Sequence, residues 1–386
     1  MFRPSCLEPT NTSAKRAVRP RATLASLLVA ALAALLAPGC SKSPSAPPAS
    51  GPARSWAMGF AGIPPVPDEA VAIATIDLWS RRADTAIQHA SVPWDSLLAG
   101  MPADTIVRRL ELPLMRYYRL GKGLKIVYEI DPTNGLNRGA EDPALVRLGR
   151  SISEPQVQAA YRAWAAAIDT IVHPDWLGLA CETNLVRLAA PPSLYAALGT
   201  LARSTAESLS AMHSRRPSLP RPVLYSSVQV ETAWGRLGGG GAYVGIATDL
   251  ADFPFSQVLG LSSYPYLGGF AEPEEIPLDY FSRIATDAAR PVMVVEGGWP
   301  TQSYATYVTS AAEQARWVRR QAQLLDAARA IGWYGLEFAD LALSQWPGTV
   351  DPSLRLFASI GFVDSALTPK PSLATWDSLF ARPLAP

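Results

Sequence analysis

Short apolar segments alternate with longer amphipathic ones along most of this chain, and this rhythm constrains the fold more than any other feature. The apolar segments are typical of strands and lie at residues 56–63, 85–90, 124–130, 176–182, 222–228, 257–264, 291–296 and 333–338. Between them, stretches such as 155–172 and 310–332 repeat apolar residues at three- and four-residue steps, which predicts helices. The strand starts lie about 30 to 52 residues apart, which suits β-α units with parallel strands. Eight such units predict a single (β/α)8 barrel.

A doubly wound open sheet is the alternative architecture for such a pattern. Sheets of that kind often carry a glycine-rich phosphate loop directly after the first strand. Here the glycine-rich stretch, residues 235–245, follows the fifth strand and contains no lysine. We therefore favour the barrel and interpret residues 235–245 as a loop over its mouth, the end at which the strands finish.

The N-terminal segment has the pattern of an export signal. Four basic residues between positions 15 and 21 precede the apolar run 22–37, which is too short for a comfortable membrane span. The following "LLAPGC" resembles the lipobox of bacterial lipoproteins, and this resemblance implies that Cys40 is lipidated and becomes the first residue. A simple signal peptide, with Cys40 incidental, is the alternative.

This pattern divides the chain into three parts. Residues 1–39 form the expected signal peptide, residues 40–55 the lipidated cysteine and a tether, and residues 56–386 the barrel domain. The tether is rich in proline and serine and lacks large apolar residues, so it cannot build a core. We expect a protein that is exported and attached by lipid to the bacterial cell envelope, on its periplasmic or surface face.

Charge and cysteine content exclude several classes of partner. Removing residues 1–39 takes away five basic residues and one acidic residue, which leaves 29 basic against 32 acidic, with no basic run to suggest nucleic acid. Cys6 leaves with the signal peptide, and Cys181 then has no internal disulfide partner. With one thiol and three histidines, we expect no metal site; we also expect no cofactor, and a monomer.

In a (β/α)8 barrel the chemistry lies where the strands end. Carboxylates, an imidazole and a tyrosine side chain lie at or just after these ends, at His89, Glu129, Asp131, Glu182, Glu231, Tyr264, Glu296 and Glu337. Such a set is typical of an enzyme that cleaves sugars rather than of a redox or phosphoryl-transfer enzyme.

Three separated motifs and the C-terminal tail carry a family resemblance. The motifs are "HPDWLGLACETNL", "VLGLSSYPYL" and "RPVMVVEGGWPT", and the tail is "FASIGFVDSALTPKPSLATW". In this order they resemble glycoside hydrolase clan A, and most of all its endo-β-1,4-galactanase group. The resemblance implies a retaining hydrolase of β-linked poly- or oligosaccharides, with galactan as the first candidate. It also implies that Glu296 is the nucleophile and Glu182 the acid/base.

The positions of these two glutamates fit that chemistry independently. Retaining glycosidases need two carboxyl groups about 5 Å apart, one to attack the anomeric carbon and one to protonate the leaving oxygen. The fourth and seventh strands face each other across a barrel mouth, so Glu182 and Glu296 can flank a sugar. Burial and mutual repulsion are expected to raise the pKa of one carboxyl and leave the other ionised.

One position departs from the family pattern. Clan A enzymes usually have an asparagine directly before the acid/base, whereas this chain has Cys181 there and its nearest asparagine at Asn184. This departure favours the alternative function, a surface lipoprotein that binds glycans on a glycosidase-like barrel without cleaving them. We set aside a lyase or aldolase, because Lys122 and Lys125 lie at the start of a strand.

Five further residues are expected to contact substrate: His89, Asn184, Tyr264, Trp299 and Trp333. Tyr264 is expected within reach of Glu296, as in the clan, and Trp299 is the preferred stacking platform for a sugar ring, on an exposed side. His89 can bind a sugar hydroxyl or hold Glu296. Glu337 is the reserve candidate for the second carboxyl group.

Overall fold

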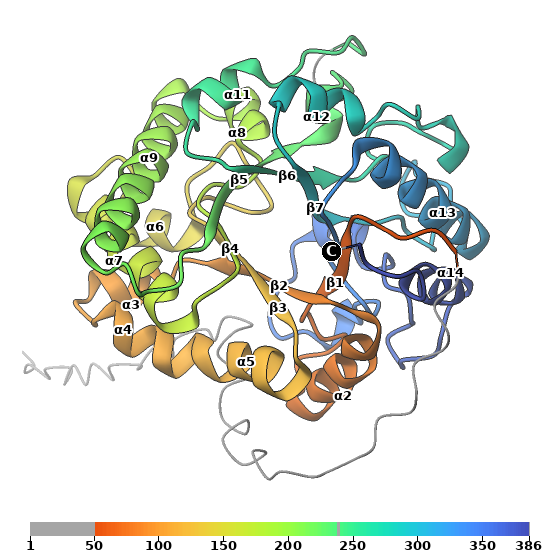
Figure 1. Ribbon diagram of the computed structural model, residues 1–386, viewed down its shortest axis with the longest axis horizontal. Helices are drawn as coiled ribbons and strands as arrows, with labels where there is room; N and C mark the ends of the chain where they lie inside the picture. The colour runs from red at the N-terminus through yellow and green to blue at the C-terminus, as the bar shows by residue number, and fades with distance from the viewer. Residues whose placement is uncertain (1–50, 238–239, 386) are drawn as a thin grey trace, which may run out of the picture.

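A computed structural model describes residues 51–237 and 240–385, which form a closed barrel of eight parallel strands. Each strand pairs with the next one in the sequence, and β8 pairs with β1 to close the ring (Figure 1). The strands are β1 (Ala57–Ala61), β2 (Thr85–Ser91), β3 (Lys125–Asp131), β4 (Trp176–Gly178), β5 (Val223–Gln229), β6 (Val258–Ser263), β7 (Val292–Gly297) and β8 (Gly332–Gly335).

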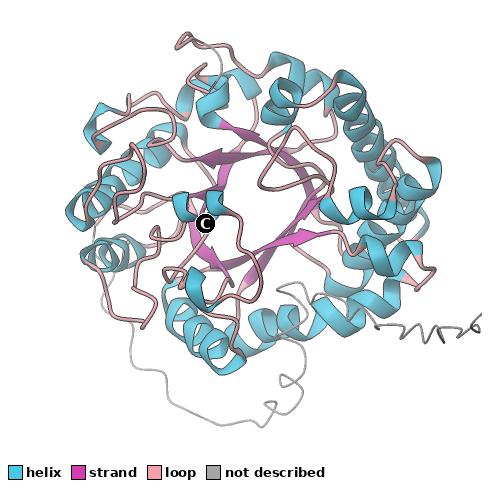
Figure 2. Ribbon diagram, turned by 180° about the vertical axis from the view of Figure 1, so that it is seen from behind, coloured by secondary structure: helices cyan, strands magenta, loops and turns pink. Residues whose placement is uncertain are grey.

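Helices surround the barrel, as both ribbon views show (Figures 1 and 2). The longer ones are α2 (Glu69–Trp79), α7 (Pro155–Val172), α9 (Pro192–Arg215), α13 (Ala311–Ala328) and α14 (Pro371–Phe380). Shorter α-helices lie between them: α3 (Trp94–Leu98), α4 (Ala103–Ile106), α5 (Leu112–Arg116), α6 (Pro143–Leu148), α8 (Thr183–Ala189), α10 (Val230–Ala233), α11 (Ala247–Asp252) and α12 (Ser282–Ala288).

Strand alternation divides the apolar residues into two shells. Inward-facing side chains, among them Ile87, Val127, Tyr225 and Met293, fill the inside of the barrel. Their strand neighbours point outward and pack against the helices. The inside of the barrel is therefore a packed core, and space for a ligand can arise only above it, at the mouth.

The predicted (β/α)8 barrel is confirmed, and each of the eight predicted strands overlaps an observed one. The predicted helix 155–172 coincides with α7, whereas α13 ends before the predicted limit because Arg329 adopts a left-handed backbone, with φ of 48°. The ladder of β4 ends at Gly178, well before Glu182, although the Leu179 N–H still bonds the Tyr225 carbonyl.

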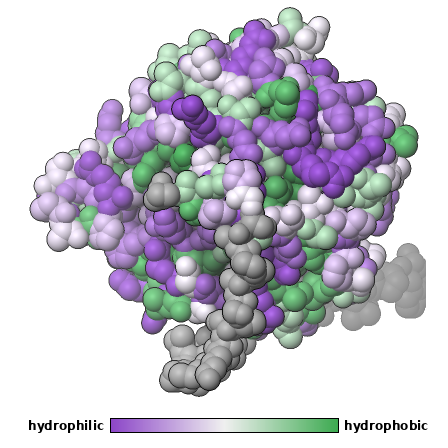
Figure 3. Space-filling model, turned by 45° about the vertical axis from the view of Figure 1, so that its right-hand side comes forward, coloured by the Kyte–Doolittle hydropathy of each residue, from purple (hydrophilic) through white to green (hydrophobic). Residues whose placement is uncertain are grey.

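The expected signal peptide, Cys40 and most of the tether lie outside the described residues. Within the described part of the chain, no helix is both long and apolar enough to cross a membrane. Figure 3 turns the α13 side forward and shows hydrophilic residues over much of this face, with hydrophobic residues in small groups among them.

Candidate active site

A polar layer lies directly above the apolar core. In β2 and β3, Ile87 pairs with Val127 inside the barrel, and two residues later His89 pairs with Glu129 on the same inward face. Gly178 of β4 makes room for them, because an added Cβ there would lie 3.0 Å from Cγ of Glu129 and 2.7 Å from the Tyr225 ring. Strand alternation thus places a histidine and a carboxylate at the floor of the mouth.

His89 is held by two acceptors at once. Its Nδ1 lies 3.2 Å from Oε2 of Glu129, and its Nε2 lies 3.1 Å from the carbonyl oxygen of Val295. When the imidazole is protonated, both ring nitrogens can donate, one to this carboxylate and one to this carbonyl. Burial acts to lower the pKa of His89, but the hydrogen bond and charge of Glu129, together with the charge of Glu296, outweigh it and raise this pKa.

Ser227 connects this layer to Glu182. Its hydroxyl donates to Oε1 of Glu129 at 2.7 Å and accepts the backbone N–H of Glu182 at 3.1 Å. Glu182 has a left-handed backbone, with φ of 43°, an uncommon conformation for a non-glycine residue that costs on the order of 1–2 kcal/mol. The sequence did not single out Ser227, although its place in β5 puts it on the inward face with Tyr225.

The side chain of Glu182 forms an ion pair with Arg138, which lies in the loop after β3. Nε of Arg138 is 2.8 Å from Oε2 of Glu182, and Nη1 is 2.5 Å from Oδ2 of Asp131. Burial acts to lower the pKa of Arg138, but the two carboxylates outweigh it and raise this pKa well above its usual value. Sequence reasoning missed Arg138, because its loop has no periodic pattern that would indicate where the side chain goes.

Glu296 enters the mouth because of an irregularity in the ladder between β6 and β7. Leu261 pairs with Val294, but the next residue, Ser262, pairs with Glu296, so the register shifts by one residue at Val295. Such a bulge reverses the alternation of the strand. Val294 packs in the outer shell, and without the shift Glu296 would follow it to the outside.

Within the mouth, Glu296 accepts a hydrogen bond of 2.6 Å from the Tyr264 hydroxyl, so the expected contact between these residues is present. Burial and the charge of Glu182 raise the pKa of Glu296 to about 7, while His89 and Tyr264 act in the opposite direction. The carboxyl groups from β4 and β7 are therefore close enough to influence each other. Glu182 is bound by the guanidinium of Arg138, and Glu296 is bound by the hydroxyl of Tyr264.

Asn184 is not a substrate contact. Its side chain is buried, its Nδ2 donates to the Gln229 carbonyl, and its Oδ1 accepts the Gln229 N–H, both at 2.8 Å. Asn184 therefore fastens the start of α8 to the end of β5. The expected contact of Asn184 with substrate is therefore absent, because both polar atoms of its amide bond this backbone. The Cys181 thiol is itself buried and points to the Ile130 carbonyl, 3.6 Å away.

Both predicted tryptophan contacts are also wrong, because the two rings are buried. Trp333 faces outward from β8, since its neighbour Tyr334 fills the barrel, and it packs on Trp317 and Trp376 with ring centroids 5.9 and 4.6 Å away. Trp299, expected on an exposed side, is 1% exposed, and its Nε1 donates to Oγ1 of Thr309 at 3.0 Å.

The remaining carboxylates support the structure around the mouth. Glu231 accepts hydrogen bonds from Gln229, Ser263 and Tyr280, and burial raises its pKa to about 7. The reserve candidate Glu337 is buried, and burial followed by the charge of Asp340 raises its pKa well above the usual range. In the described part of the chain, no group of three histidine, cysteine or acidic residues is arranged to hold a metal ion.

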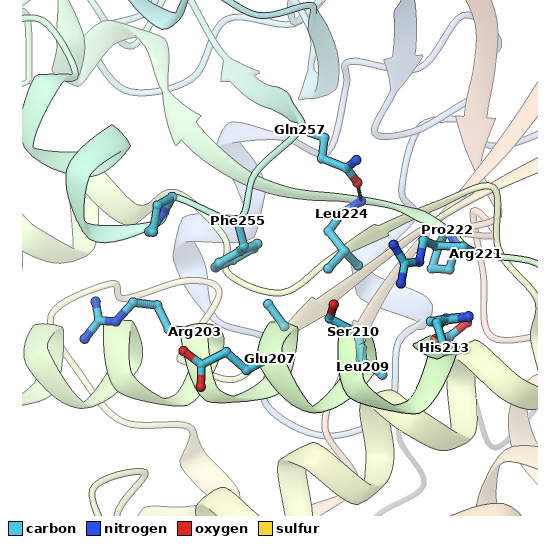
Figure 4. A pocket seen from close by; sticks show the side chains of 13 residues that line it. Arg203, Glu207, Leu209, Ser210, His213, Arg221, Pro222, Leu224, Phe255 and Gln257 are labelled. Carbon is cyan, nitrogen blue, oxygen red and sulfur yellow. Dashed lines mark hydrogen bonds and ion pairs between the residues drawn. The ribbon is translucent and has the colours of Figure 1, made fainter. Parts of the chain in front are cut away.

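A cavity of about 490 Å³ lies away from the mouth, between α9 and the segments that lead into β5 and β6 (Figure 4). Among the described residues between β5 and β6, the helices are the short α10 and α11. His213 of α9 lines it and bonds the buried Asp169 of α7 at 2.7 Å. None of the predicted site residues lines this cavity.

No protein-family model matches the sequence, and no curated protein matches it either. Solved structures do resemble the fold. The chain is 15% identical to a β-glucuronidase from an uncultured Clostridium species, with a TM-score of 0.53, and 15% identical to the exo-β-1,4-mannosidase Op5Man5 from Opitutaceae bacterium strain TAV5, with a TM-score of 0.56. It is 11% identical to xylanase 10B from Thermotoga maritima, with a TM-score of 0.54.

Each of these comparisons covers 84% of this chain. The chain spans 50% of the length of the glucuronidase and 58% of the mannosidase, but 95% of the xylanase. At such low identity the likeness shows the (β/α)8 fold.

Proposed function

We propose that this protein is a retaining glycoside hydrolase that cleaves β-linked poly- or oligosaccharides, with a galactan-like glycan as the first candidate. The observation that carries the proposal is that Glu182, paired with Arg138 in the segment after β4, and Glu296 of β7, bonded by Tyr264, lie at one barrel mouth, on either side of the contacts through Ser227, Glu129 and His89. Two carboxyl groups that flank a bound sugar are the machinery of retaining glycoside hydrolysis. The names of the structural neighbours, which include a glucuronidase, a mannosidase and a xylanase, support the same class of reaction.

In this proposal Glu296 attacks the anomeric carbon, and Glu182 protonates the leaving oxygen and then activates water. The Tyr264 hydroxyl and the His89 imidazolium favour the ionised form of Glu296 that attack requires. Because the pKa of Glu296 is about 7, the rate should rise as the pH increases through about 7. When Glu182 receives a proton, its ion pair with Arg138 becomes a hydrogen bond between a guanidinium and a neutral carboxyl.

Substitution with azide rescue tests these roles. Glu296→Gln keeps the shape but cannot form a glycosyl-enzyme, so we expect a loss on the order of a thousandfold in rate. Glu182→Ala should still react with a dinitrophenyl glycoside, and added azide should restore its turnover with a β-glycosyl azide as product. Glu296→Ala should give the α-anomer, which NMR distinguishes. Wild-type rates in both variants would refute the assignment.

The alternative function is glycan binding without cleavage. Two observations favour it. Cys181 stands at the position where clan A enzymes usually have asparagine, and the carboxylate of Glu182 is held in an ion pair with Arg138. Incubation with a panel of β-glycans separates the two functions. Release of reducing ends supports hydrolysis, whereas measurable binding with no release on any glycan supports the binding protein.

We further propose that the protein is exported and anchored by lipid on Cys40. The support is the basic and apolar pattern before "LLAPGC" in the sequence. The wild-type protein should partition into detergent, and Cys40→Ser should not be processed to the same mature mass. Equal intact masses of the mature forms, apart from the substituted atom, would contradict the lipid anchor.

A further inference from the structure

Arg138 has hydrogen-bonding capacity that the rest of the protein does not use. A guanidinium carries five N–H groups. Nε donates to Glu182, and Nη1 donates to Asp131 and, at 3.1 Å, to Oγ1 of Thr133. Among residues 51–237 and 240–385, these are the acceptors of Arg138, and the two N–H groups of Nη2 have none.

The position of Nη2 makes these two donors available beside Glu182. In the planar guanidinium, Nη2 lies on the same edge as Nε, which is the atom that contacts Glu182. Nη2 is not one of the buried polar atoms that lack a partner, and 7% of the Arg138 side chain is exposed. A ligand that reaches Glu182 can therefore accept a hydrogen bond from Nη2.

The charges around Arg138 decide which kind of acceptor fits. Its guanidinium already faces the carboxylates of Asp131 and Glu182, and Glu129 and Glu296 lie in the same mouth. The cations that oppose these four acidic residues are Arg138 and His89. A further carboxylate would meet a site that is already negative, and like charges in a partly buried site repel each other strongly.

We propose that Arg138 is a substrate-binding residue that donates from Nη2 to a hydroxyl of an uncharged sugar, and that the site discriminates against uronic acids. This inference rests on the proposed function, because it takes the ligand to be the glycoside cleaved between Glu182 and Glu296. A hydroxyl oxygen accepts the hydrogen bond without adding charge, so a bound sugar leaves the ion pair of Arg138 with Asp131 intact.

Binding of thioglycosides, which resist hydrolysis, tests the proposal on the full-length wild-type protein. The probes are 4-nitrophenyl 1-thio-β-D-glucoside and the corresponding thio-β-D-glucuronide, which differ only at C6, with the galactoside and galacturonide as a second pair. Calorimetry should show each neutral ligand bound at least about tenfold more tightly than its uronide. Because the discrimination is electrostatic, the ratio between the affinities for the neutral ligand and its uronide should become smaller as the salt concentration increases from about 0.05 to 0.5 M.

Arg138→Lys tests the hydrogen bond itself, because it keeps the charge and removes the Nη2 donors. We expect at least about fivefold weaker binding of the neutral ligand. Within a set of monodeoxy analogues, the one that lacks the contacted hydroxyl should bind wild type and variant equally. Arg187→Lys is the matched control, since Arg187 pairs with the buried Asp249 and bonds neither Glu182 nor Glu296, and it should bind like wild type. Circular dichroism checks that each variant is folded.

The outcomes separate this inference from the proposed function. Tighter or equal binding of the uronides overturns it, as does an Arg138→Lys variant that binds every ligand like wild type. The corresponding O-glycosides are assayed for hydrolysis in parallel. If the ligands are bound with the expected preference but neither the O-glycosides nor the panel of β-glycans is cleaved, the hydrolase proposal fails and the ligand class holds. If neither class of ligand binds, this inference fails, and the panel of β-glycans decides the hydrolase proposal separately.

Discussion

At the scale of single residues, the mouth is a connected set of polar groups rather than two isolated glutamates. Hydrogen bonds run from the Glu182 backbone through Ser227 to Glu129, on to His89, and then to the Val295 carbonyl next to Glu296. Each member is held by its neighbours, so the carboxyl groups have defined positions before any ligand arrives. Such preorganisation is what catalysis by two opposed carboxyls requires.

Tyr264→Phe tests the role of this network at Glu296. The Tyr264 hydroxyl favours the ionised carboxylate, so its removal should raise the pKa of Glu296 above about 7. The acidic limb of the pH–rate profile should then move upward, with about tenfold less activity near pH 7 and a much smaller loss near pH 9.

The control is Tyr195→Phe, which removes a comparable hydrogen bond to Asp252, formed between α9 and α11, away from the mouth. Its pH–rate profile should match that of the wild type. An unshifted acidic limb in Tyr264→Phe would show that the tyrosine does not act through the protonation of Glu296.

At the scale of elements, the junction of β6 and β7 decides the geometry of the site. The register shift at Val295 turns Glu296 inward, and β6 leads into Tyr264, which bonds it. The two strands approach closely at Gly297, where an added Cβ would lie 2.6 Å from the Ser263 carbonyl oxygen. Glycine is needed there for space rather than for an unusual backbone angle.

Gly297→Ala should therefore push β6 and β7 apart. We expect the free energy of unfolding to fall by about 1–3 kcal/mol, as for other overpacked interiors. Because Tyr264 and Glu296 lie on either side of this contact, activity should fall even in the folded fraction. Urea denaturation and rates normalised to folded protein measure both effects; unchanged stability would mean that the strands adjust without strain.

At the scale of the whole molecule, several buried carboxyl groups make stability depend on pH. Burial raises the pKa of Glu111, Glu231 and Glu296 to about 7, above the ordinary value of 4.5. The folded protein consequently binds more protons than the unfolded chain between these values. This contribution to stability is complete below about pH 4.5 and is lost as the pH rises through about 7.

Glu111→Gln should reduce the loss of folding stability that occurs as the pH rises through about 7. Glu111 lies buried in the stretch that connects α4 to α5, away from the mouth. We expect the variant to be about 1–3 kcal/mol more stable than wild type at pH 9 and to show no such gain near pH 4.5. Glu207→Gln, at an exposed position of α9, is the control, and its denaturation curves should follow wild type at both pH values.

The sequence alone determined the architecture and much of the inventory of the site. Apolar segments at regular spacing predicted all eight strands, because each strand must bury its side chains on both faces of a barrel wall. The ends of these strands also indicated His89, Glu182, Tyr264 and Glu296. The strands could be predicted because they depend on local periodicity, and the positions of these residues at the mouth could be predicted because they depend on where a parallel strand has to end; the roles of the residues remain predictions.

Only the tertiary structure decided which side chains enter the mouth. A one-residue register shift turns Glu296 inward, a nonperiodic loop delivers Arg138, and strand alternation sends Trp333 into the outer shell. The side-chain amide of Asn184 forms hydrogen bonds with the backbone N–H and carbonyl of Gln229. The physical reason is common to all four: orientation depends on hydrogen-bond partners and packing from segments far apart in the chain, which residue type and spacing do not encode.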